Sequence, residues 1–417
     1  MTSAPQHSDT EHLRQAMALH QAGRAAEADE HYAAVLRAEP GNAQALRLRG
    51  ILARDTGNSG LSLKLLRKAA DAAPSDPEPA AELGLSYLAA GYLQLAEDAF
   101  RRALARDPDS RKALANLGAL LQYRGHVQAS IDCHRRALEL DADDVEVRCN
   151  LATTLLEAGR GDEALGECDA ALAETPGRTE LLATKGAVLV GLDRYADALP
   201  LLEATLEAGP DDMALINLGL ALQQLGQVDQ ALAVLEAAVR VNPDNARAAA
   251  DLTTLLSAAG RSERALQLSE DFLRRHPGER LVLASRGVAL RDAGQGDAFR
   301  QLVDLQRLVR VRDLPVPRGY ADITDFNSRL ADLLRAEPSL LASPLSKATR
   351  GGAQTGELDP DSSPVLAAFR EALNAELKSV IAELGSEGFG GHPVMAWAAE
   401  RWTLRIWGTV LAPGGHQ

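Results

Sequence analysis

The stretch "ALANLGALLQYRGHVQASIDCHRRALELDADD" at residues 113–144 contains two helix-forming segments separated by a glycine. In the first segment Leu114, Leu117 and Leu121 recur at intervals of three and four residues, the spacing of one helix face. Gly125 follows at a place that favours a left-handed helix cap, which a residue without a Cβ adopts freely. The stretch therefore predicts two helices joined by a short glycine turn.

The same pattern recurs along the chain at a shift of 34 residues. A first column holds small residues: Ala16, Gly50, Gly84, Gly118, Ala152, Gly186, Gly219 and Gly287. A second column, seven residues later, holds glycine: Gly23, Gly57, Gly91, Gly125, Gly159, Gly226, Gly260 and Gly294. A third column holds Ala or Ser: Ala28, Ser62, Ala96, Ser130, Ala164, Ala198, Ala231 and Ala265. Prolines close the units: Pro40, Pro74, Pro108, Pro176, Pro210, Pro243 and Pro277.

Each column has a physical reason. Small residues of the first and third columns let the two helices of a unit approach closely, and proline follows the second helix because it cannot continue it. One unit has 33 residues, and its missing residue falls between Pro210 and Gly219. We expect that deletion in a connection, since inside a helix it would rotate the apolar face.

These aligned columns resemble the tetratricopeptide repeat. Eight units begin near residues 9, 43, 77, 111, 145, 179, 212 and 246. A ninth, beginning near 280, has Phe299 in place of the small residue of its second helix, which suits an end cap or a junction. The resemblance implies an all-α fold, a right-handed superhelix of about nine helix pairs over residues 9–312, after a disordered tail at residues 1–8.

A candidate peptide-binding groove follows from the same alignment. Two positions before the first column lie Asn116, Asn150 and Asn217, with Asp251 at an equivalent place. An Asn amide offers donors and an acceptor to a peptide backbone, and similar repeat arrays hold extended peptide on such a ladder along the inner groove. The alternative is that Asn here only makes local contacts within the repeat, and the sequence leaves both interpretations open.

One partner is disfavoured by the position after the first column. Co-chaperone repeats that clamp a C-terminal carboxylate have Asn there, whereas this chain has Ile51, Leu85, Ala119, Thr153, Ala187, Leu220, Thr254 and Val288. We therefore do not expect a clamp for chaperone tails.

The 34-residue register stops after about residue 312. We expect a linker at 312–320, a helix at 324–338 with Phe326 and Leu330 on its apolar face, and a Gly/Ser/Pro-rich loop at 343–364. Ser363 as N-cap and Pro364 in the first turn predict a helix that Gly385 ends.

The final segment "RWTLRIWGTVLAPGGHQ" (401–417) alternates like a strand and ends in a Gly-Gly-His-Gln turn. One predicted face holds Trp402, Leu404, Ile406 and Val410, and the other holds Thr403, Arg405, Trp407 and Thr409. A lone strand leaves its backbone groups unpaired, so we expect it to need strands that this sequence does not supply.

The order of "GYADITDFN", "KATRGGAQTGEL" and "LRIWGTVLAPGGHQ" resembles the opening part of an iron(II)/2-oxoglutarate-dependent oxygenase domain that often follows tetratricopeptide repeats in bacteria. The resemblance spans residues 313–417 and implies a short α+β segment, an incomplete jelly roll. In the family the iron ligands, an H-x-D/E pair and a distal His, come after such a segment. We therefore expect no iron and no 2-oxoglutarate site in this chain, only in a full-length parent, and no catalytic activity from the chain alone.

Histidines and loops elsewhere do not replace those ligands. The H-x-D of His7 and Asp9 lies in a polar tail and is taken as chance. His416 would lie near the mouth of the site in a relative but is not assigned as a ligand, and His392 has no carboxylate or Cys nearby in the sequence. "TRGGAQTG" (349–356) lacks the Gly-Lys-Ser/Thr of a phosphate loop and predicts an ordered surface loop.

Composition excludes other classes of partner. The formal charge is −14, which disfavours nucleic acid and anionic membranes, because both need a basic face. Neither a signal peptide nor a run of about 20 apolar residues is present, and Cys133, Cys149 and Cys168 lack metal-site spacing. We expect a cytoplasmic protein with reduced structural thiols.

Two functions remain open at this point. One is a repeat-guided dioxygenase, in which the solenoid recruits protein or peptide substrate to the iron centre of the full-length parent. The other is a non-catalytic adaptor that binds protein partners in its inner groove. A repeat-bearing glycosyl- or sulfotransferase is disfavoured because residues 313–417 contain no nucleotide-binding loop.

Overall fold

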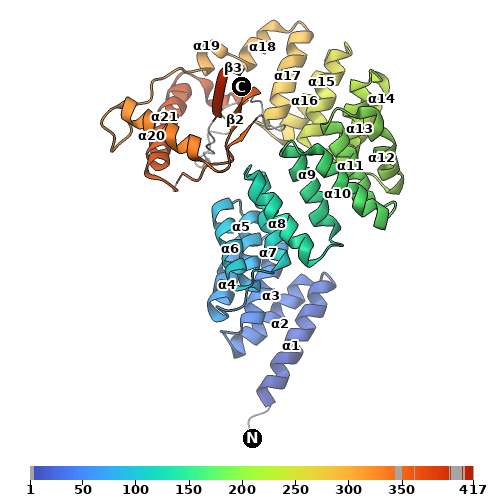
Figure 1. The fold of residues 1–417 in the computed structure, drawn as a ribbon, viewed down its shortest axis with the longest axis vertical. Helices are drawn as coiled ribbons and strands as arrows, with labels where there is room; N and C mark the ends of the chain where they lie inside the picture. The colour runs from blue at the N-terminus through green and yellow to red at the C-terminus, as the bar shows by residue number, and fades with distance from the viewer. Residues whose placement is uncertain are drawn as a thin grey trace. The chain divides into compact units, whose positions relative to one another are not determined.

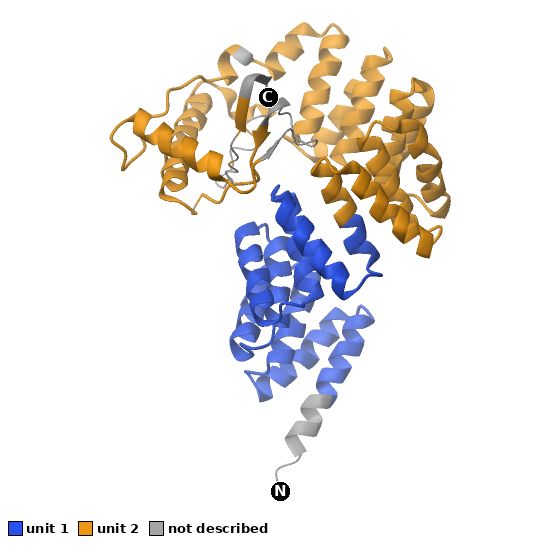
Figure 2. Cartoon of the chain, viewed as in Figure 1, with its two compact units in different colours: residues 1–150 blue, residues 151–417 orange. Residues whose placement is uncertain are grey.

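The structure is a computed structural model that describes residues 4–342, 350–360, 362–393, 395, 406 and 409–416. The chain divides into two compact units, residues 1–150 and 151–417 (Figure 2). The division falls inside helix α9 (Val145–Glu157). The second unit contains both repeats and the C-terminal region, and the domain boundary expected after residue 312 stays a prediction.

Antiparallel helix pairs make up most of both units (Figure 1). The first unit contains α1 (Ala4–Gln21), α2 (Ala25–Ala38), α3 (Ala43–Asp55), α4 (Ser59–Ala72), α5 (Glu78–Ala89), α6 (Leu93–Arg106), α7 (Arg111–Tyr123), α8 (Val127–Leu140) and the start of α9. The second continues with α10 (Gly161–Glu174), α11 (Thr179–Gly191), α12 (Tyr195–Ala208), α13 (Asp212–Gln224), α14 (Val228–Val241), α15 (Ala246–Ala258), α16 (Ser262–Arg275), α17 (Arg280–Asp292) and α18 (Gly296–Leu302). Short α19 (Leu305–Leu308) ends the series.

The predicted units are confirmed in their helical register. From α3 onward, the first helix of each unit begins within one residue of the predicted start. The first unit differs, because α1 already begins at Ala4 and so includes residues 4–8, which the sequence assigned to a disordered tail. The connection between α12 and α13 has the predicted deletion, since only residues 209–211 separate these helices, whereas residues 107–110 separate α6 from α7.

Glycines of the second column end the first helix of each pair as predicted. They adopt left-handed φ values, such as 78° at Gly57 and 77° at Gly226. The sixth unit has Asp193 at this place, with a φ of 58°. A short polar side chain tolerates this conformation better than a bulky one, so the turn persists without glycine.

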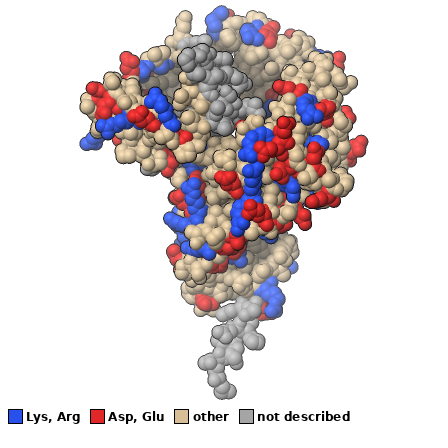
Figure 3. All heavy atoms as spheres, viewed as in Figure 1, with Lys and Arg blue, Asp and Glu red and all other residues tan. Residues whose placement is uncertain are grey.

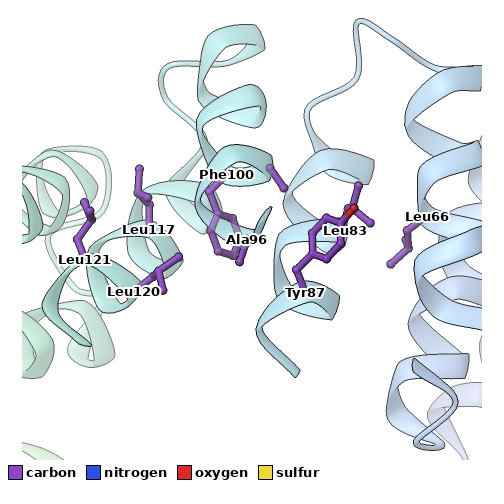
Figure 4. Close-up of a cluster of buried hydrophobic side chains, with 9 residues drawn as sticks. Leu66, Leu83, Tyr87, Ala96, Phe100, Leu117, Leu120 and Leu121 are labelled. Atoms are coloured by element: carbon purple, nitrogen blue, oxygen red, sulfur yellow. The ribbon is translucent and has the colours of Figure 1, made fainter. Parts of the chain in front are cut away.

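A buried column that the sequence analysis did not single out completes the packing. Sixteen residues after the first column, a large side chain of the second helix lies against the small residue of the first helix. A Cβ on Gly84 would lie 2.5 Å from Phe100, and one on Gly186 would lie 2.7 Å from Leu202. Phe100 is fully buried in the cluster that Figure 4 shows between α5, α6 and α7. Every member of the third column, from Ala28 to Ala265, is also fully buried.

The ninth unit is looser, as its Phe299 suggested. Its second helix, α18, has only 7 residues and no buried side chain. A Cβ on Gly287 would have Val303 at 3.7 Å and Phe299 at 3.9 Å, which is ordinary contact. The close helix approach of the earlier units therefore ends here.

The C-terminal region contains two longer helices and a small sheet. These are α20 (Ile323–Ala336), α21 (Pro364–Ser386), the 3-10 helix η1 (Phe389–Gly391), β1 (Leu341–Ala342), β2 (Arg350–Gln354) and β3 (Thr409–His416). Ser363 caps α21 by accepting from the backbone N–H of Leu366 at 3.2 Å, as predicted. Phe326 of α20 is 1% exposed and contacts Phe369 of α21, which confirms its predicted face.

Three sequence predictions in this region are wrong. The segment 343–364, predicted as a loop, contains β2, and so does the "TRGGAQTG" stretch. The closing strand does have a partner in the chain, because the antiparallel sheet has the order β1-β2-β3. The predicted final turn is also wrong, since β3 continues to His416. Gly352 pairs with Leu411 in the ladder, and Gly351 lies at a shift of the register. Neither has a side chain, so the alternation that identifies a strand is missing.

The aromatic part of the closing segment lies outside the described residues. These are Trp397, Trp402 and Trp407, together with Thr403, Leu404 and Arg405. Of the predicted apolar face, Ile406 is 7% exposed and forms a bridge with Leu358, while Val410 is half-buried. A jelly roll is not seen in the described residues, whose strands form this one small sheet.

Candidate functional site

Asn116 and Asn150 line one cleft of the first unit. The cleft has a volume of about 300 Å³ and lies between α7 and the start of α9. Its walls contain Arg111, Lys112, Ala115, Asn116, Ala119, Asp144, Glu146, Val147 and Asn150. A buried cluster of Leu114, Ala137 and Val147 holds α7, α8 and α9 together. The 34-residue spacing thus brings two of the four predicted groove residues to one site.

Asn217 and Asp251 belong to the second unit and do not line this cleft. Asn217 is half-buried on α13. Asp251 on α15 forms an ion pair with Arg247 at 2.8 Å, one helical turn earlier. The role of all four residues in a peptide groove stays a prediction.

Asn116 makes a local contact, as one of the two interpretations expects, and its role in peptide binding stays a prediction. Its Nδ2 donates to the backbone carbonyl of Lys112 at 2.7 Å, which is a local contact within α7. No other hydrogen bond of this side chain occurs in the described part of the chain, so its Oδ1 can accept from a bound ligand. The local bond holds the amide in place at the cleft wall.

Glu82 occupies the same repeat position one unit earlier and is 3% exposed. Its carboxylate forms ion pairs with Lys112 of the cleft wall and, at 2.7 Å, with Arg54. Burial raises the pKa of Glu82, but the hydrogen bonds from Lys112 and Arg54 outweigh it and hold the pKa below the ordinary carboxyl value. Glu82 is therefore ionised at neutral pH, and Lys112 and Arg54 share its single charge. Arg54 has a second carboxylate partner in Asp55 at 3.4 Å.

Arg111, Lys112, Asp144 and Glu146 are cleft residues that the sequence analysis did not name. Lys112 and Glu146 each lie four residues before an Asn of the ladder, so they share its helix face. Asp144 caps α9, because its Oδ1 accepts from the backbone N–H of Val147 at 3.1 Å. The four-residue spacing is a signal that would have found two of these residues.

The thiols have no shared site in the structure. Cys133, Cys149 and Cys168 are all free cysteines, and Cys168 is buried. Burial, helped by the neighbouring Asp132, raises the pKa of Cys133 to about 11, so this thiol is protonated at neutral pH.

The described residues do not gather a set of metal ligands. That part of the chain contains no group of three or more His, Cys, Asp or Glu side chains that could hold a metal ion. His392 instead contacts the backbone carbonyl of Gln301 through its Nε2 at 2.9 Å. The described helices also include none that is long and apolar enough to cross a membrane.

Comparison with known proteins identifies the helix pairs. Three family profiles, each described as the tetratricopeptide repeat, match residues 13–77, 80–110, 116–179, 155–222, 189–256 and 222–287. The chain is 30% identical over 185 residues to an Hsp70-Hsp90 organizing protein from Triticum aestivum. That match covers 44% of this chain and 28% of the relative, so the chain spans less than a third of the relative's length.

A solved structure supports the same fold. A tetratricopeptide repeat protein from Parabacteroides merdae ATCC 43184 superposes with a TM-score of 0.52 at 17% identity, covering 60% of this chain and 99% of that chain. At this identity the likeness shows the fold alone. Together the profiles match well over half of the residues, and the chain belongs to the tetratricopeptide repeat family.

Proposed function

We propose that this chain is a protein-interaction scaffold that binds an extended peptide along the first helices of its repeats. The observation that carries the proposal is the cleft of about 300 Å³ with Asn116 on one wall and Asn150 on the other. This volume is at the lower end of the range for ligand sites, which suits a few residues of extended chain. A side-chain amide carries both donors and an acceptor, and the Oδ1 of Asn116 can accept from a backbone N–H while its Nδ2 donates to Lys112, so recognition does not depend on the side chains of the peptide.

The wheat relative supports a protein as the partner, because its name describes an organizer of two chaperones. We do not extend the chaperone tails themselves to this chain. Ala119 and Thr153 stand where a carboxylate clamp would need Asn. The partner we propose is an internal, extended segment of another protein.

Peptide binding by designed variants tests this function. Peptides of about nine residues, roughly 30 Å when extended, are acetylated and amidated, selected from a random library on the full chain, and titrated by fluorescence anisotropy. We expect the double variant Asn116→Ala, Asn150→Ala to weaken the selected peptides about tenfold or more, since two hydrogen bonds of about 1 kcal/mol each are lost. Asn327→Ala, an exposed Asn on α20, serves as the matched control. Equal affinity of the double variant and the control rejects the groove.

We further propose that residues 313–417 form the entry half of an iron(II)/2-oxoglutarate-dependent oxygenase domain, to which the repeats bring a protein substrate. The support is the family resemblance of "KATRGGAQTGEL" and "LRIWGTVLAPGGHQ" in their order along the chain. The described residues gather no set of three metal ligands, so no iron chemistry is assigned to this chain's own side chains. The alternative is a non-catalytic adaptor.

The coding sequence after residue 417 and a cofactor titration separate these two. The oxygenase proposal expects an H-x-D/E pair and a distal His downstream, and iron(II)-dependent turnover of 2-oxoglutarate only in the extended protein. An open reading frame that closes without these ligands, or an extended protein without turnover, leaves the adaptor as the function.

A further inference from the structure

We propose that the cleft between α7 and α9 selects a cationic side chain, Lys or Arg, in the bound peptide and repels carboxylates. This inference rests on the proposed peptide-binding function and names the class of its ligand. The inference rests on the charges at one position of the repeat, four residues before the Asn ladder. Two residues at this position, Lys112 and Glu146, line the cleft.

Most charged members of this position already have an ion-pair partner. Glu78 pairs with Arg47 at 3.5 Å, Glu180 with Arg178 at 3.0 Å, and Arg247 with Asp251 at 2.8 Å. Lys112 pairs with the buried Glu82. Glu146 is exposed in the first turn of α9 and has no ion pair or side-chain hydrogen bond with any described residue. It is thus the charged member of the column whose partner is missing from the described structure.

The cations of the cleft cannot compensate Glu146. Arg111 forms an ion pair with Asp141. Lys112 pairs with Glu82, and Arg54, the second partner of Glu82, also pairs with Asp55 at 3.4 Å. Asp144 adds a second carboxylate to the wall, though α9 already uses it as its cap. Once each cation is counted with its own partner, the charges left in the cleft are two carboxylates. On the face that Figure 3 shows, acidic and basic side chains of the described residues intermingle.

The side-chain amides of Asn150 and Asn116 fit the same peptide with a cationic side chain. Glu146 and Asn150 lie one helical turn apart on α9, and Asn116 faces them from α7 across the cleft. A bound segment whose backbone is held by the two Asn side chains would therefore carry a side chain within reach of Glu146. A guanidinium or ammonium there gains a charge-assisted hydrogen bond, whereas a carboxylate meets Glu146 and Asp144.

Matched peptide pools on the full chain test the inference. Three capped pools of about nine residues have Arg, Gln or Glu at the centre and uncharged random residues elsewhere, and their affinities are measured by fluorescence anisotropy. We expect the Arg pool to bind about two- to fivefold more tightly than the Gln pool, and the Glu pool to bind more weakly than both. Raising NaCl from about 50 to 500 mM should remove these differences.

Two variants of Glu146 separate the effect of its charge on binding from an effect of altered structure. In Glu146→Gln the three pools should bind alike, and in Glu146→Lys the Glu pool should become the preferred one. Glu139→Lys makes the same charge change on α8, where Glu139 pairs with Arg136, and should keep the wild-type order. A reversed preference cannot arise from misfolding, so this gain is the decisive readout.

The possible outcomes distinguish this inference from the proposed function. If no pool binds, or if binding is insensitive to the double Asn variant, the groove itself is wrong. If all pools bind equally through Asn116 and Asn150, or if the Glu pool is preferred by the wild type, the cationic selectivity is overturned and the groove remains.

Discussion

The helix pairs of α3–α14 and the region after α17 bury their side chains in different ways. In five of these six pairs, a Gly of the first helix packs against a large side chain sixteen residues later, as Gly50 does against Leu66 and Gly219 against Leu235. The pair of α9 and α10 has Ala152 and Cys168 at these places. After α17 this contact opens, since the nearest atom to a Cβ on Gly287 is 3.7 Å away. The repeated contact is local in sequence, so every pair carries its own core.

The C-terminal region is joined to the end of the repeats by single, unrepeated contacts. The guanidinium of Arg307 lies 4.3 Å from the ring centre of Phe389, and Arg310 binds both carboxylate oxygens of Glu387 at 2.7 Å. Arg312 pairs with Glu383 of α21. These partners are more than 70 residues apart, and the side chains of the ion pairs are partly exposed. Buried apolar contacts therefore hold the helix pairs together, whereas polar contacts near the surface hold this junction.

The largest effect should come from removing a buried side chain of the pairs. Phe100→Ala empties a fully buried site against Gly84 and should cost about 3–5 kcal/mol of unfolding free energy. Val303→Ala removes the equivalent, half-buried side chain of the ninth unit and should cost only about 1 kcal/mol. Denaturant unfolding followed by circular dichroism checks both values. Equal losses would contradict the difference between the two regions.

A second prediction concerns His134, a polar residue in the buried column that lies sixteen residues after the first column. His134 is fully buried against Gly118, and neither ring nitrogen has a hydrogen-bond partner among the described residues. Burial lowers the pKa of His134 from 6.5 to about 4. As pH falls from about 6.5 to about 4, the unfolded chain takes up a proton that the folded chain refuses, so stability is lost in this window, by up to about 3 kcal/mol.

The variant His134→Leu should remove that component of the pH dependence, because Leu fills the same place in other units. We expect its stability curve, relative to wild type, to flatten between pH 6.5 and 4 and to differ little above pH 7. Phe100→Leu changes a non-titrating member of the column and should leave the pH dependence as it is in wild type. Identical pH curves for His134→Leu and wild type would show that the site accepts the proton.

A smaller effect should come from adding one methyl group at Gly84, in a closely packed pair, or at Gly287, in the looser ninth unit. Gly84→Ala places a Cβ 2.5 Å from the Phe100 ring, and overpacking of about 1–3 kcal/mol exceeds the gain of up to about 1 kcal/mol in helix propensity. Gly287→Ala meets no such contact and should stabilise the protein by about 0.5–1 kcal/mol. Thermal melting of the two variants should therefore show shifts of opposite sign.

The sequence predicted the elements that have a regular local pattern and missed those that lack one. The starts of α7 and α17, the cap Ser363 and the buried face of Phe326 follow from local patterns, and the structure confirms them. β2 was missed because its Gly-Gly pair lacks side-chain alternation. The burial of His134 was missed because this residue is polar, whereas most units have an apolar residue sixteen positions after the first column.

The candidate site was predictable only in part for the same reason. A period of 34 residues places Asn116 and Asn150 on successive units, so their meeting in one cleft follows from the register. The pairing of Lys112 with Glu82 depends on side-chain reach between units, which no period encodes. The charge left on Glu146 is therefore visible only once the partners of its neighbours are known.

The smallest effect is expected at the junction with the C-terminal region. Arg310→Ala removes an ion pair whose side chains are 24% and 38% exposed, so screening by water limits the loss to about 0.5–1 kcal/mol. Because this contact is local, global unfolding is a poor readout, and hydrogen exchange of residues 309–316 and 387–392 is the suitable one. Exchange there should quicken in Arg310→Ala at low salt, and wild type should approach the variant as NaCl rises to about 1 M. Arg318→Ala, an exposed arginine without an ion pair among the described residues, should leave exchange unchanged. If Arg310→Ala instead destabilised the helix pairs as strongly as Phe100→Ala, the junction would belong to the apolar core, and the two regions would not differ in kind.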